Sequence, residues 1–209
     1  MPPPPCPDWS GEESLTQLPD VVRGMADVHR LIIKHAKKTR IIDHGDIKTW
    51  HAKVFANVVP KSYYAGNFRS DESSRPCLQV DVAVPPNPGA PFSDVPRLMR
   101  ELSDEIATFT KRTDSFIGSG VTETDKARAV LQLTAFVVGK FLKIHPFRNG
   151  NGRISRLLTN YFLHRYGYRL LYENPLPRPP TPYDVASAAC MTGDPTLMYE
   201  YLLVALTKA

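Results

Sequence analysis

Apolar residues recur three and four positions apart along most of this chain, the spacing that gives an α-helix one apolar face. The cleanest stripe combines apolar side chains and one histidine at positions i, i+3, i+4, i+7, i+8 and i+11: Ile47, Trp50, His51, Val54, Phe55 and Val58. Similar stripes predict a helix over residues 20–38, with Asp20 as its N-cap, and another that begins at Ser93. The pattern therefore predicts a mainly helical protein.

Further helices are predicted on both sides of a polar, glycine-rich segment. The sequence Thr122-Glu-Thr-Asp125 is a capping box, so it predicts the start of a long apolar helix that ends just before His145. Beyond the polar segment, helical spacing continues to Gly167, which can end a helix in the left-handed conformation. Two short helices follow, one ending at Gly193 and one starting at Asp194-Pro195, an N-cap followed by proline.

Three stretches lack the helical period. Residues 1–19 are rich in proline and polar residues and are predicted to form a flexible leader, followed by one domain over residues 20–209. Between Ser62 and Pro91, alternating apolar residues predict a short extended hairpin or flap: Leu78, Val80, Val82 and Val84. The proline-rich stretch from Pro175 to Pro182 predicts a loop.

Composition places the chain among ordinary globular proteins. Hydrophobic residues make up 42% and charged residues 22% of the 209 positions, so we expect one well-buried domain rather than wholesale disorder. The net charge of +5 suits an anionic ligand, but it is too small and too dispersed to predict a nucleic-acid partner. The most apolar stretch, Ala129–Leu142, is too short to span a bilayer, so it predicts a core helix and no membrane partner.

The cysteines are widely separated in the sequence. Cys6, Cys77 and Cys190 are an odd number, form no close pair and have no metal-ligand spacing. This usage predicts reduced thiols, as in the cytoplasm. The first residues contain neither the basic region nor the apolar core of a classical secretory signal, so we expect a cytoplasmic protein.

One polar segment carries the candidate chemistry: His-Pro-Phe-Arg-Asn-Gly-Asn-Gly-Arg-Ile-Ser-Arg, from His145 to Arg156. An imidazole can take a proton from a hydroxyl near neutral pH, glycines let backbone amides approach an anion, and arginines complement a polyphosphate. Because the segment joins two predicted helices, the amides from Gly150 to Arg153 belong to a helix N-terminus, which favours anions. Arg153 and Arg156 are expected to share a face, and the side-chain amide of Asn151 is a further phosphate donor.

Other phosphate and metal signatures fit less well. Gly150-Asn-Gly152 is close to the dinucleotide-binding glycine fingerprint, but that fingerprint follows a strand and this one follows a predicted helix. The sequence contains no P-loop and no metal-binding His-Glu-x-x-His pattern. The remaining histidines lack ligand spacing and are expected on helix faces or the surface: His29, His35, His44, His51 and His164.

The segment from His145 to Arg156 closely resembles the signature of the Fic family, His-x-Phe-x-(Asp/Glu)-Gly-Asn-Gly-Arg-x-x-Arg. Every specified position matches except Asn149. Ala65-Gly66-Asn67-Phe68-Arg69 and the hairpin after it also resemble the family's flap region, and the resemblance extends over residues 20–206. It implies an all-α fold, a Fic-type helical bundle with a short β-hairpin flap.

The resemblance also implies an activity. It is that of a protein nucleotidyltransferase, which takes ATP or another nucleoside triphosphate as co-substrate and transfers AMP, or a related nucleotide, to a Ser, Thr or Tyr hydroxyl of a target protein. His145 would be the general base for this reaction. The implied phosphate-binding residues are an anion hole and two arginines, one for the leaving pyrophosphate and one for the terminal phosphate: Gly150, Asn151, Gly152, Arg153 and Arg156.

Two further roles follow from the same resemblance. Phe147 would anchor the segment in the core. The flap would dock an extended stretch of the target protein by adding it as a strand, through Leu78, Val80, Val82 and Val84.

Asn149 stands where the family carries Asp or Glu, the residue that holds Mg²⁺ against the phosphates. An amide oxygen keeps the shape of a carboxylate but not its charge, which hard cations prefer. Three consequences stay open. Mg²⁺ is held weakly and mainly by phosphates, with slow transfer; the chain moves another phosphate-linked group; or it is a degenerate module that binds nucleotide without reacting.

Regulation is a second departure from many family members. Those proteins are restrained by a helix that carries (Ser/Thr)-x-x-x-Glu-(Gly/Asn). Here Glu173 is the only glutamate followed by Gly or Asn, and Arg169 stands four residues before it. Either a separate, antitoxin-like inhibitory protein acts in trans, or the domain is not restrained in this way. Bacterial family members include resident toxins and proteins delivered into host cells, which need no classical signal.

Overall fold

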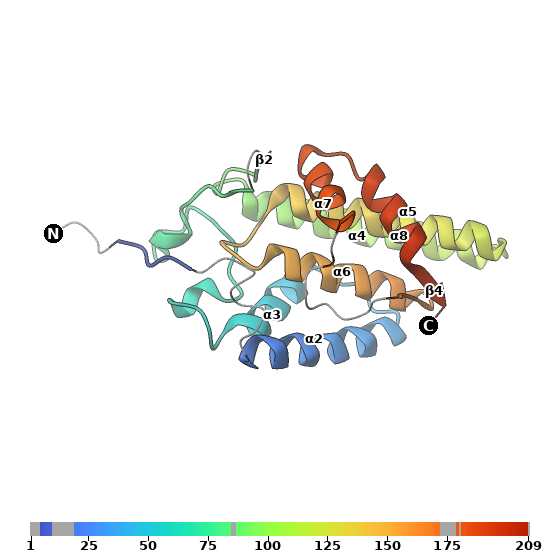
Figure 1. Cartoon of the computed structure of the whole chain (residues 1–209), viewed down its shortest axis with the longest axis horizontal. Helices are drawn as coiled ribbons and strands as arrows, with labels where there is room; N and C mark the ends of the chain where they lie inside the picture. The colour runs from blue at the N-terminus through green and yellow to red at the C-terminus, as the bar shows by residue number, and fades with distance from the viewer. Residues whose placement is uncertain (1–4, 10–18, 85–86, 172–178, 180, 209) are drawn as a thin grey trace.

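The computed structural model describes residues 5–9, 19–84, 87–171, 179 and 181–208, and within them the chain is mainly helical (Figure 1). The α-helices are α2 (Pro19–Lys37), α3 (His44–Phe55), α4 (Val95–Gly118), α5 (Glu123–Ile144), α6 (Asn151–Arg165), α7 (Tyr183–Thr192) and α8 (Thr196–Ala205). Two short 3₁₀-helices lie between α3 and α4: η1 (Ser62–Tyr64) and η2 (Pro76–Leu78). The predicted mainly helical fold is confirmed.

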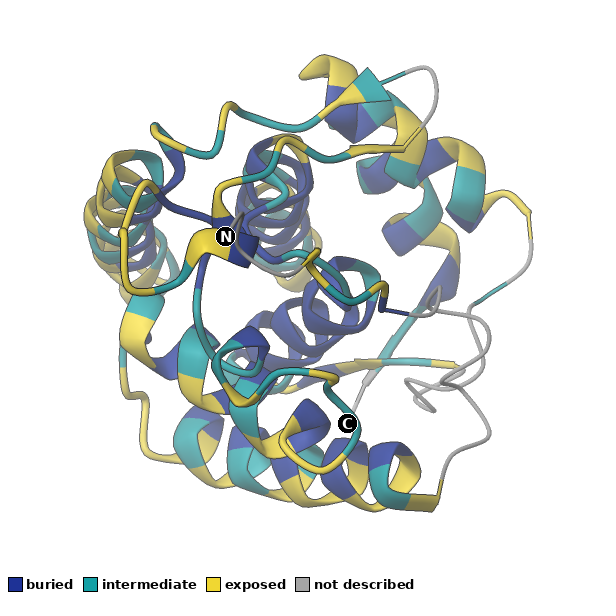
Figure 2. Cartoon of the chain, turned by 90° about the vertical axis from the view of Figure 1, so that its left-hand side faces the viewer, coloured by how far each residue is buried: buried dark blue, intermediate teal, exposed yellow. Residues whose placement is uncertain are grey.

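Helix α6 runs through the centre of the bundle, with α2 along one side of it and α5 along the other (Figure 1). Its side chains are buried almost all round, which the sequence explains by its dense apolar content: Ile154, Leu157, Leu158, Tyr161, Phe162 and Leu163. The outer helices α2 and α4 instead show one buried and one exposed face (Figure 2). A central helix of this kind fixes its own N-terminus firmly, because it is packed from several sides.

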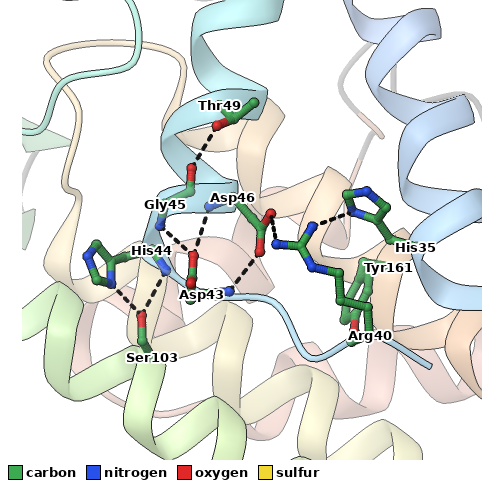
Figure 3. Close-up of polar contacts among 9 residues, drawn as sticks. All are labelled: His35, Arg40, Asp43, His44, Gly45, Asp46, Thr49, Ser103 and Tyr161. Carbon is green, nitrogen blue, oxygen red and sulfur yellow. Dashed lines mark hydrogen bonds and ion pairs between the residues drawn. The ribbon is translucent and has the colours of Figure 1, made fainter. Parts of the chain in front are cut away.

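The start of α3 is held by a capping box (Figure 3). The side chain of Asp43 accepts hydrogen bonds from the backbone N–H groups of Gly45 at 2.7 Å and Asp46 at 3.0 Å, and the Asp46 carboxylate accepts the N–H of Asp43 at 3.1 Å. Arg40 forms an ion pair with Asp46 at 2.8 Å. This cap fixes the register of α3, which carries His51 towards the segment between α5 and α6.

Two small antiparallel sheets complete the fold. Strand β1 (Ala83–Val84) pairs with β2 (Asn87–Pro88) to form the expected hairpin, and residues 85–86 between them lie outside the described residues. Strand β3 (Tyr168–Leu170) pairs with β4 (Leu206–Lys208) near the other end of the bundle. The sequence did not predict this second sheet, because three-residue strands are too short to show alternation.

The helix boundaries lie within about three residues of the sequence pattern, but α2 begins at Pro19, so Asp20 lies in its first turn and the prediction of Asp20 as N-cap is wrong. The Thr122 side chain accepts the N–H of Asp125 at 3.2 Å at the start of α5, as the capping box predicts. Gly167 and Gly193 follow α6 and α7 with φ angles of +83° and +99°. The N-cap of α8 is Pro195 rather than the predicted Asp194, whose side chain accepts the N–H of Thr196 at 2.9 Å. Most of the loop expected at Pro175–Pro182, and Glu173, lie outside the described residues.

Cys6 and Cys77 form a disulfide in the structure, so the prediction of reduced thiols is wrong for this pair. The two cysteines are 71 residues apart, and no local pattern indicates that the fold brings them together. Cys190 is free and buried. None of the described helices is both long enough and apolar enough to cross a bilayer.

Part of the predicted leader packs against the domain. Within residues 5–9, the Trp9 side chain is only 7% exposed and belongs to the hydrophobic core. Residues 1–4 and 10–18 lie outside the described residues, so the division into leader and domain at residue 19 stays a prediction.

Candidate active site

The motif segment forms a tight connection between the end of α5 and the start of α6, which we call the motif loop (residues 145–150). His145 ends α5 with a left-handed backbone, φ +52° and ψ +58°, and its N–H donates to the carbonyl of Phe141 at 2.9 Å. Gly150 is the N-cap of α6 with φ +81°. A Cβ at this position would lie 2.4 Å from the Phe55 ring, so only glycine fits between the loop and α3.

The imidazole of His145 is in a state that can accept a proton. Its Nδ1 lies 3.3 Å from the carbonyl of Leu142, and since a carbonyl only accepts, Nδ1 carries the hydrogen and Nε2 keeps its lone pair. Burial lowers the pKa of His145 to about 4, with a smaller lowering by the charge of Arg69, while the Leu142 bond raises it. The ring is therefore neutral at pH 7.

Arg69 ties the motif loop to the hairpin. Its guanidinium is fully buried and donates to the carbonyls of His145 at 2.8 and 3.0 Å and Ile144 at 3.1 Å. It also donates to Val80 at 3.1 Å and Ala90 at 2.8 Å, on the two flanks of the hairpin. One side chain thus holds the backbone of His145 and the base of the flap together. Burial lowers the pKa of Arg69 to about 10, so it stays charged at pH 7.

A stacked pair of rings anchors the loop in the core. Phe147 is fully buried, as the resemblance implies, and its ring stacks on His51 with centroids 3.7 Å apart and planes 15° apart. His51 also bonds the backbone at both ring nitrogens: Nδ1 accepts from Gly66 at 2.9 Å and Nε2 lies 3.0 Å from the carbonyl of Asn149. These contacts require a neutral ring with hydrogen on Nε2.

The side chain of Asn151 forms hydrogen bonds within the motif loop. Its Oδ1 accepts the N–H of Phe147 at 2.9 Å and its Nδ2 donates to the carbonyl of Phe147 at 2.8 Å. One of its two amide N–H groups is thus used within the loop, and Asn151 also lines the cavity, so its expected role as a phosphate donor stays a prediction. The backbone amides at the start of α6 remain the donors available for an anion.

Asn149 gives little support to a protein-held metal. Its Oδ1 accepts the N–H of Gly150 at 2.6 Å, so the neutral amide oxygen is already used to shape the loop. Within the described part of the chain, no cluster of three or more His, Cys, Asp or Glu residues is placed to hold a metal ion. The residues present therefore do not fit a protein-held Mg²⁺ site.

A cavity of about 560 Å³ opens beside the motif loop. It is lined by residues of the motif, the hairpin, α7 and the N-terminal segment, among them His145, Arg148, Asn149, Gly150, Asn151, Gly152, Arg156, Val82, Val84, Tyr183 and Trp9. The structure thus brings the predicted base, the glycine-rich helix start and Arg156 to one space.

The two motif arginines separate, which corrects the expectation that they share a face. Arg156 lines the cavity. Arg153 is fully buried, with its guanidinium carbon 6.0 Å from the centre of the Phe55 ring, and is not among the lining residues. Its predicted role at the pyrophosphate is therefore not reflected in this arrangement.

Only some of the predicted flap residues lie at the cavity. Val82 and Val84 line the cavity, and the carbonyl of Val80 is bound by Arg69. Leu78 is fully buried in η2, so the expected extended alternation is wrong at this position. The spacing of Leu78 and Val80 fits a strand, but it also fits a 3₁₀ turn that buries its apolar side chain. Leu78 adopts the turn, in which its side chain is buried.

Several site residues carried no chemical signal in the sequence. His51 appeared as one position of a helical stripe, and Arg69 as part of the stretch that resembles the flap region. Nothing marked Trp9, which belongs to the predicted leader yet lines the cavity. Residues that act through packing across the fold leave no local pattern.

The region that carries the motif matches a known protein family. The Fic/DOC family model matches residues 41–163, which is more than half of the chain and includes the whole motif. The chain belongs to the Fic/DOC family. Over 123 residues it is 31% identical to the protein adenylyltransferase Fic of Drosophila persimilis and 32% identical to that of Drosophila grimshawi. These alignments cover 59% of this chain but only 19% and 20% of the Drosophila proteins, so it spans about one-fifth of their length.

Solved structures share the Fic fold. A Fic domain-containing signalling protein of Bacteroides thetaiotaomicron matches with a TM-score of 0.64 at 20% identity, over 95% of this chain and 71% of that one. The BepC effector of Bartonella tribocorum, solved with bound AMPPNP, matches with a TM-score of 0.57 at 14% identity, over 90% and 88%. A Bartonella quintana Fic domain with bound ADP has a TM-score of 0.56 at 15% identity, over 90% and 85%.

Proposed function

We propose that this chain is a protein nucleotidyltransferase that moves AMP, or a related nucleoside monophosphate, from a nucleoside triphosphate to a hydroxyl side chain of a target protein. The observation that carries the proposal is a neutral His145 in the same cavity as the N-terminus of α6 and Arg156. The Drosophila relatives named as protein adenylyltransferases, and the Bartonella domains solved with AMPPNP and ADP, support it.

The proposed reaction uses the groups that line the cavity. Nε2 of His145 takes the proton of the target hydroxyl as its oxygen forms a bond to the α-phosphorus. The bond from that phosphorus to the bridging oxygen breaks, and pyrophosphate leaves. The backbone amides of the first turn of α6 and the guanidinium of Arg156 stabilise the phosphate charge.

Mg²⁺ would enter as a partner of the triphosphate, since Asn149 offers no charge to hold it. The ion would neutralise phosphate charge when bound. The hydroxyl would come from a Ser, Thr or Tyr in an extended segment of the target protein, added as a strand beside β1. Val82 and Val84 would meet its side chains, and main-chain hydrogen bonds would align it with little demand on sequence.

A labelling experiment tests the proposal. Purified protein is incubated with a cell lysate and each of four α-labelled nucleoside triphosphates, with Mg²⁺ or Mn²⁺. We expect label on one or more lysate proteins, loss of that label with His145→Ala, and wild-type labelling with the control His35→Ala on α2. Asn149→Asp tests the metal directly. Label that is absent from the wild type with every nucleotide, yet appears with Asn149→Asp, would contradict an active enzyme and favour the degenerate nucleotide-binding module.

A further inference from the structure

The N-terminal segment, residues 5–9, forms part of the cavity wall. Trp9 lines the cavity beside Arg148 and Asn149, although it is more than 130 residues away from them in sequence. Its indole is the largest side chain in that wall and is almost completely buried. The position of this one ring therefore sets the shape of the cavity where it meets the motif loop.

Three aromatic rings hold the indole. Trp9 stacks on Tyr64 with centroids 5.9 Å apart and planes 25° apart, and it meets Phe55 and His51 edge-on at 5.4 and 6.0 Å. His51 is the residue that bonds the carbonyl of Asn149. Trp9 thus packs on the same side chains that support the motif loop, so its loss would alter both the wall and the loop behind it.

Covalent and polar contacts keep the segment on the domain. The Cys6–Cys77 disulfide fixes one end, and the Tyr64 hydroxyl donates to the carbonyl of Pro7 at 3.2 Å. The carbonyl of Cys77 accepts a hydrogen bond from Arg148 at 2.8 Å, and Arg148 lines the cavity. Arg148 therefore connects the disulfide-bonded Cys77 directly to the cavity wall.

We propose that Trp9 is an affinity-determining residue of the nucleotide cavity and that the Cys6–Cys77 disulfide holds it in place. Reduction of this bond then weakens nucleotide binding. The proposal rests on the proposed function, since it takes the cavity to be the nucleotide site. In the reduction, a dithiol supplies two electrons and two protons, the sulfur–sulfur bond breaks, Cys6 and Cys77 become thiols, and the dithiol becomes a disulfide.

Calorimetric titration with AMPPNP tests this proposal on the full chain. The samples are the oxidised wild type, the wild type reduced with dithiothreitol, Trp9→Ala, Trp9→Phe and Cys6→Ser, with Pro5→Ser, an exposed position of the same segment, as a control. We expect about tenfold weaker binding by Trp9→Ala, since buried aromatic anchors contribute disproportionately to affinity. The affinity of Trp9→Phe for AMPPNP should lie between those of Trp9→Ala and the oxidised wild type. Pro5→Ser should bind as tightly as the oxidised wild type, and the reduced wild type should bind with the same affinity as Cys6→Ser.

The reductant control is internal. Cys190 is free and buried, so Cys6–Cys77 is the only disulfide among the three cysteines, and the affinity of Cys6→Ser does not change with dithiothreitol. Thermal unfolding shows whether each variant is folded, and reduction of the wild type requires no substitution. Equal affinity in the oxidised wild type, the reduced wild type and Trp9→Ala would overturn this inference alone. Absence of binding in the oxidised wild type would overturn the proposed function and the inference with it.

Discussion

The imidazole of His51 joins α3 to the motif loop, because its Nε2 donates to the carbonyl of Asn149 across 3.0 Å. The other ring nitrogen accepts the N–H of Gly66, and the ring face stacks on Phe147. A single buried histidine therefore satisfies two backbone groups and supports the buried phenylalanine of the motif. The shape of the cavity depends on α3 as much as on the motif itself.

Replacing His51 with alanine should destabilise the protein strongly. Two buried backbone groups lose their partner and the Phe147 ring loses its stack, so we expect a loss of about 3 kcal/mol in the free energy of unfolding. Urea unfolding measures it. His44→Ala, which removes a partly buried histidine bonded to Ser103, is the matched control and should cost about 1 kcal/mol. Equal losses of unfolding free energy in His51→Ala and His44→Ala would show that the hydrogen bond from His51 to Asn149 does not contribute to stability beyond an ordinary histidine contact.

Two histidines of the site, His51 and His145, predict how stability depends on pH. The pKa of His51 is lowered to about 3 and that of His145 to about 4, mainly by burial, whereas both are near 6.5 in an unfolded chain. Between pH 6.5 and about 4, the unfolded state therefore binds protons that the folded state excludes.

The free energy of unfolding should consequently be constant above pH 7 and fall as the pH drops from 6.5 to 4. Each histidine contributes a slope of about 1.4 kcal/mol per pH unit at most. Urea unfolding over this range measures the slope, and His145→Ala should make it shallower. A slope unchanged by His145→Ala would contradict a buried neutral imidazole at that position.

Gly150 should not tolerate a side chain. Gly150→Ala combines a left-handed φ of +81° with a Cβ placed 2.4 Å from the Phe55 ring, so we expect a loss of about 3 kcal/mol or more. Gly120 has a similar φ of +82° but no atom within 4 Å, so Gly120→Ala isolates the backbone cost of about 1 kcal/mol. Gly118→Ala meets nothing and should be neutral. Chemical denaturation of the three variants ranks them, and equal costs at Gly150 and Gly120 would refute the steric argument.

The motif arginines should separate in their effects. Arg156 lines the cavity, so Arg156→Ala should weaken AMPPNP binding by about tenfold. Arg153 is fully buried against Phe55, so Arg153→Ala should lower the unfolding free energy by about 3 kcal/mol. Titration calorimetry and urea unfolding on both variants distinguish the two roles. A larger affinity loss for Arg153→Ala, with stability intact, would show that Arg153 reaches the ligand.

The helices could be predicted because their information is local. The stripe from Ile47 to Val58, the cap at Thr122 and the glycines at 167 and 193 each act within a few residues. The motif likewise located the cavity, since its residues are contiguous.

The remaining features depend on contacts between distant segments. The bond from Asn151 back to Phe147, the Arg69 cluster and the Cys6–Cys77 disulfide appear only when the chain is folded. Leu78 shows the same limit, because its burial in η2 overrides an alternation that fits a strand. Arg156 lines the cavity and Arg153 does not because of the way α6 packs against its neighbours. The spacing of the two arginines in the sequence does not determine this packing.

The position of the label in ATP tests the proposed nucleotidyl transfer most directly. Parallel incubations with a lysate use ATP labelled at the α-phosphate or at the γ-phosphate, with the wild type and His145→Ala. We expect stable protein labelling from α-labelled ATP by the wild type alone, because the γ-phosphate leaves with pyrophosphate. Labelling from γ-labelled ATP, or equal α-labelling by His145→Ala, would contradict nucleotidyl transfer with His145 as its base.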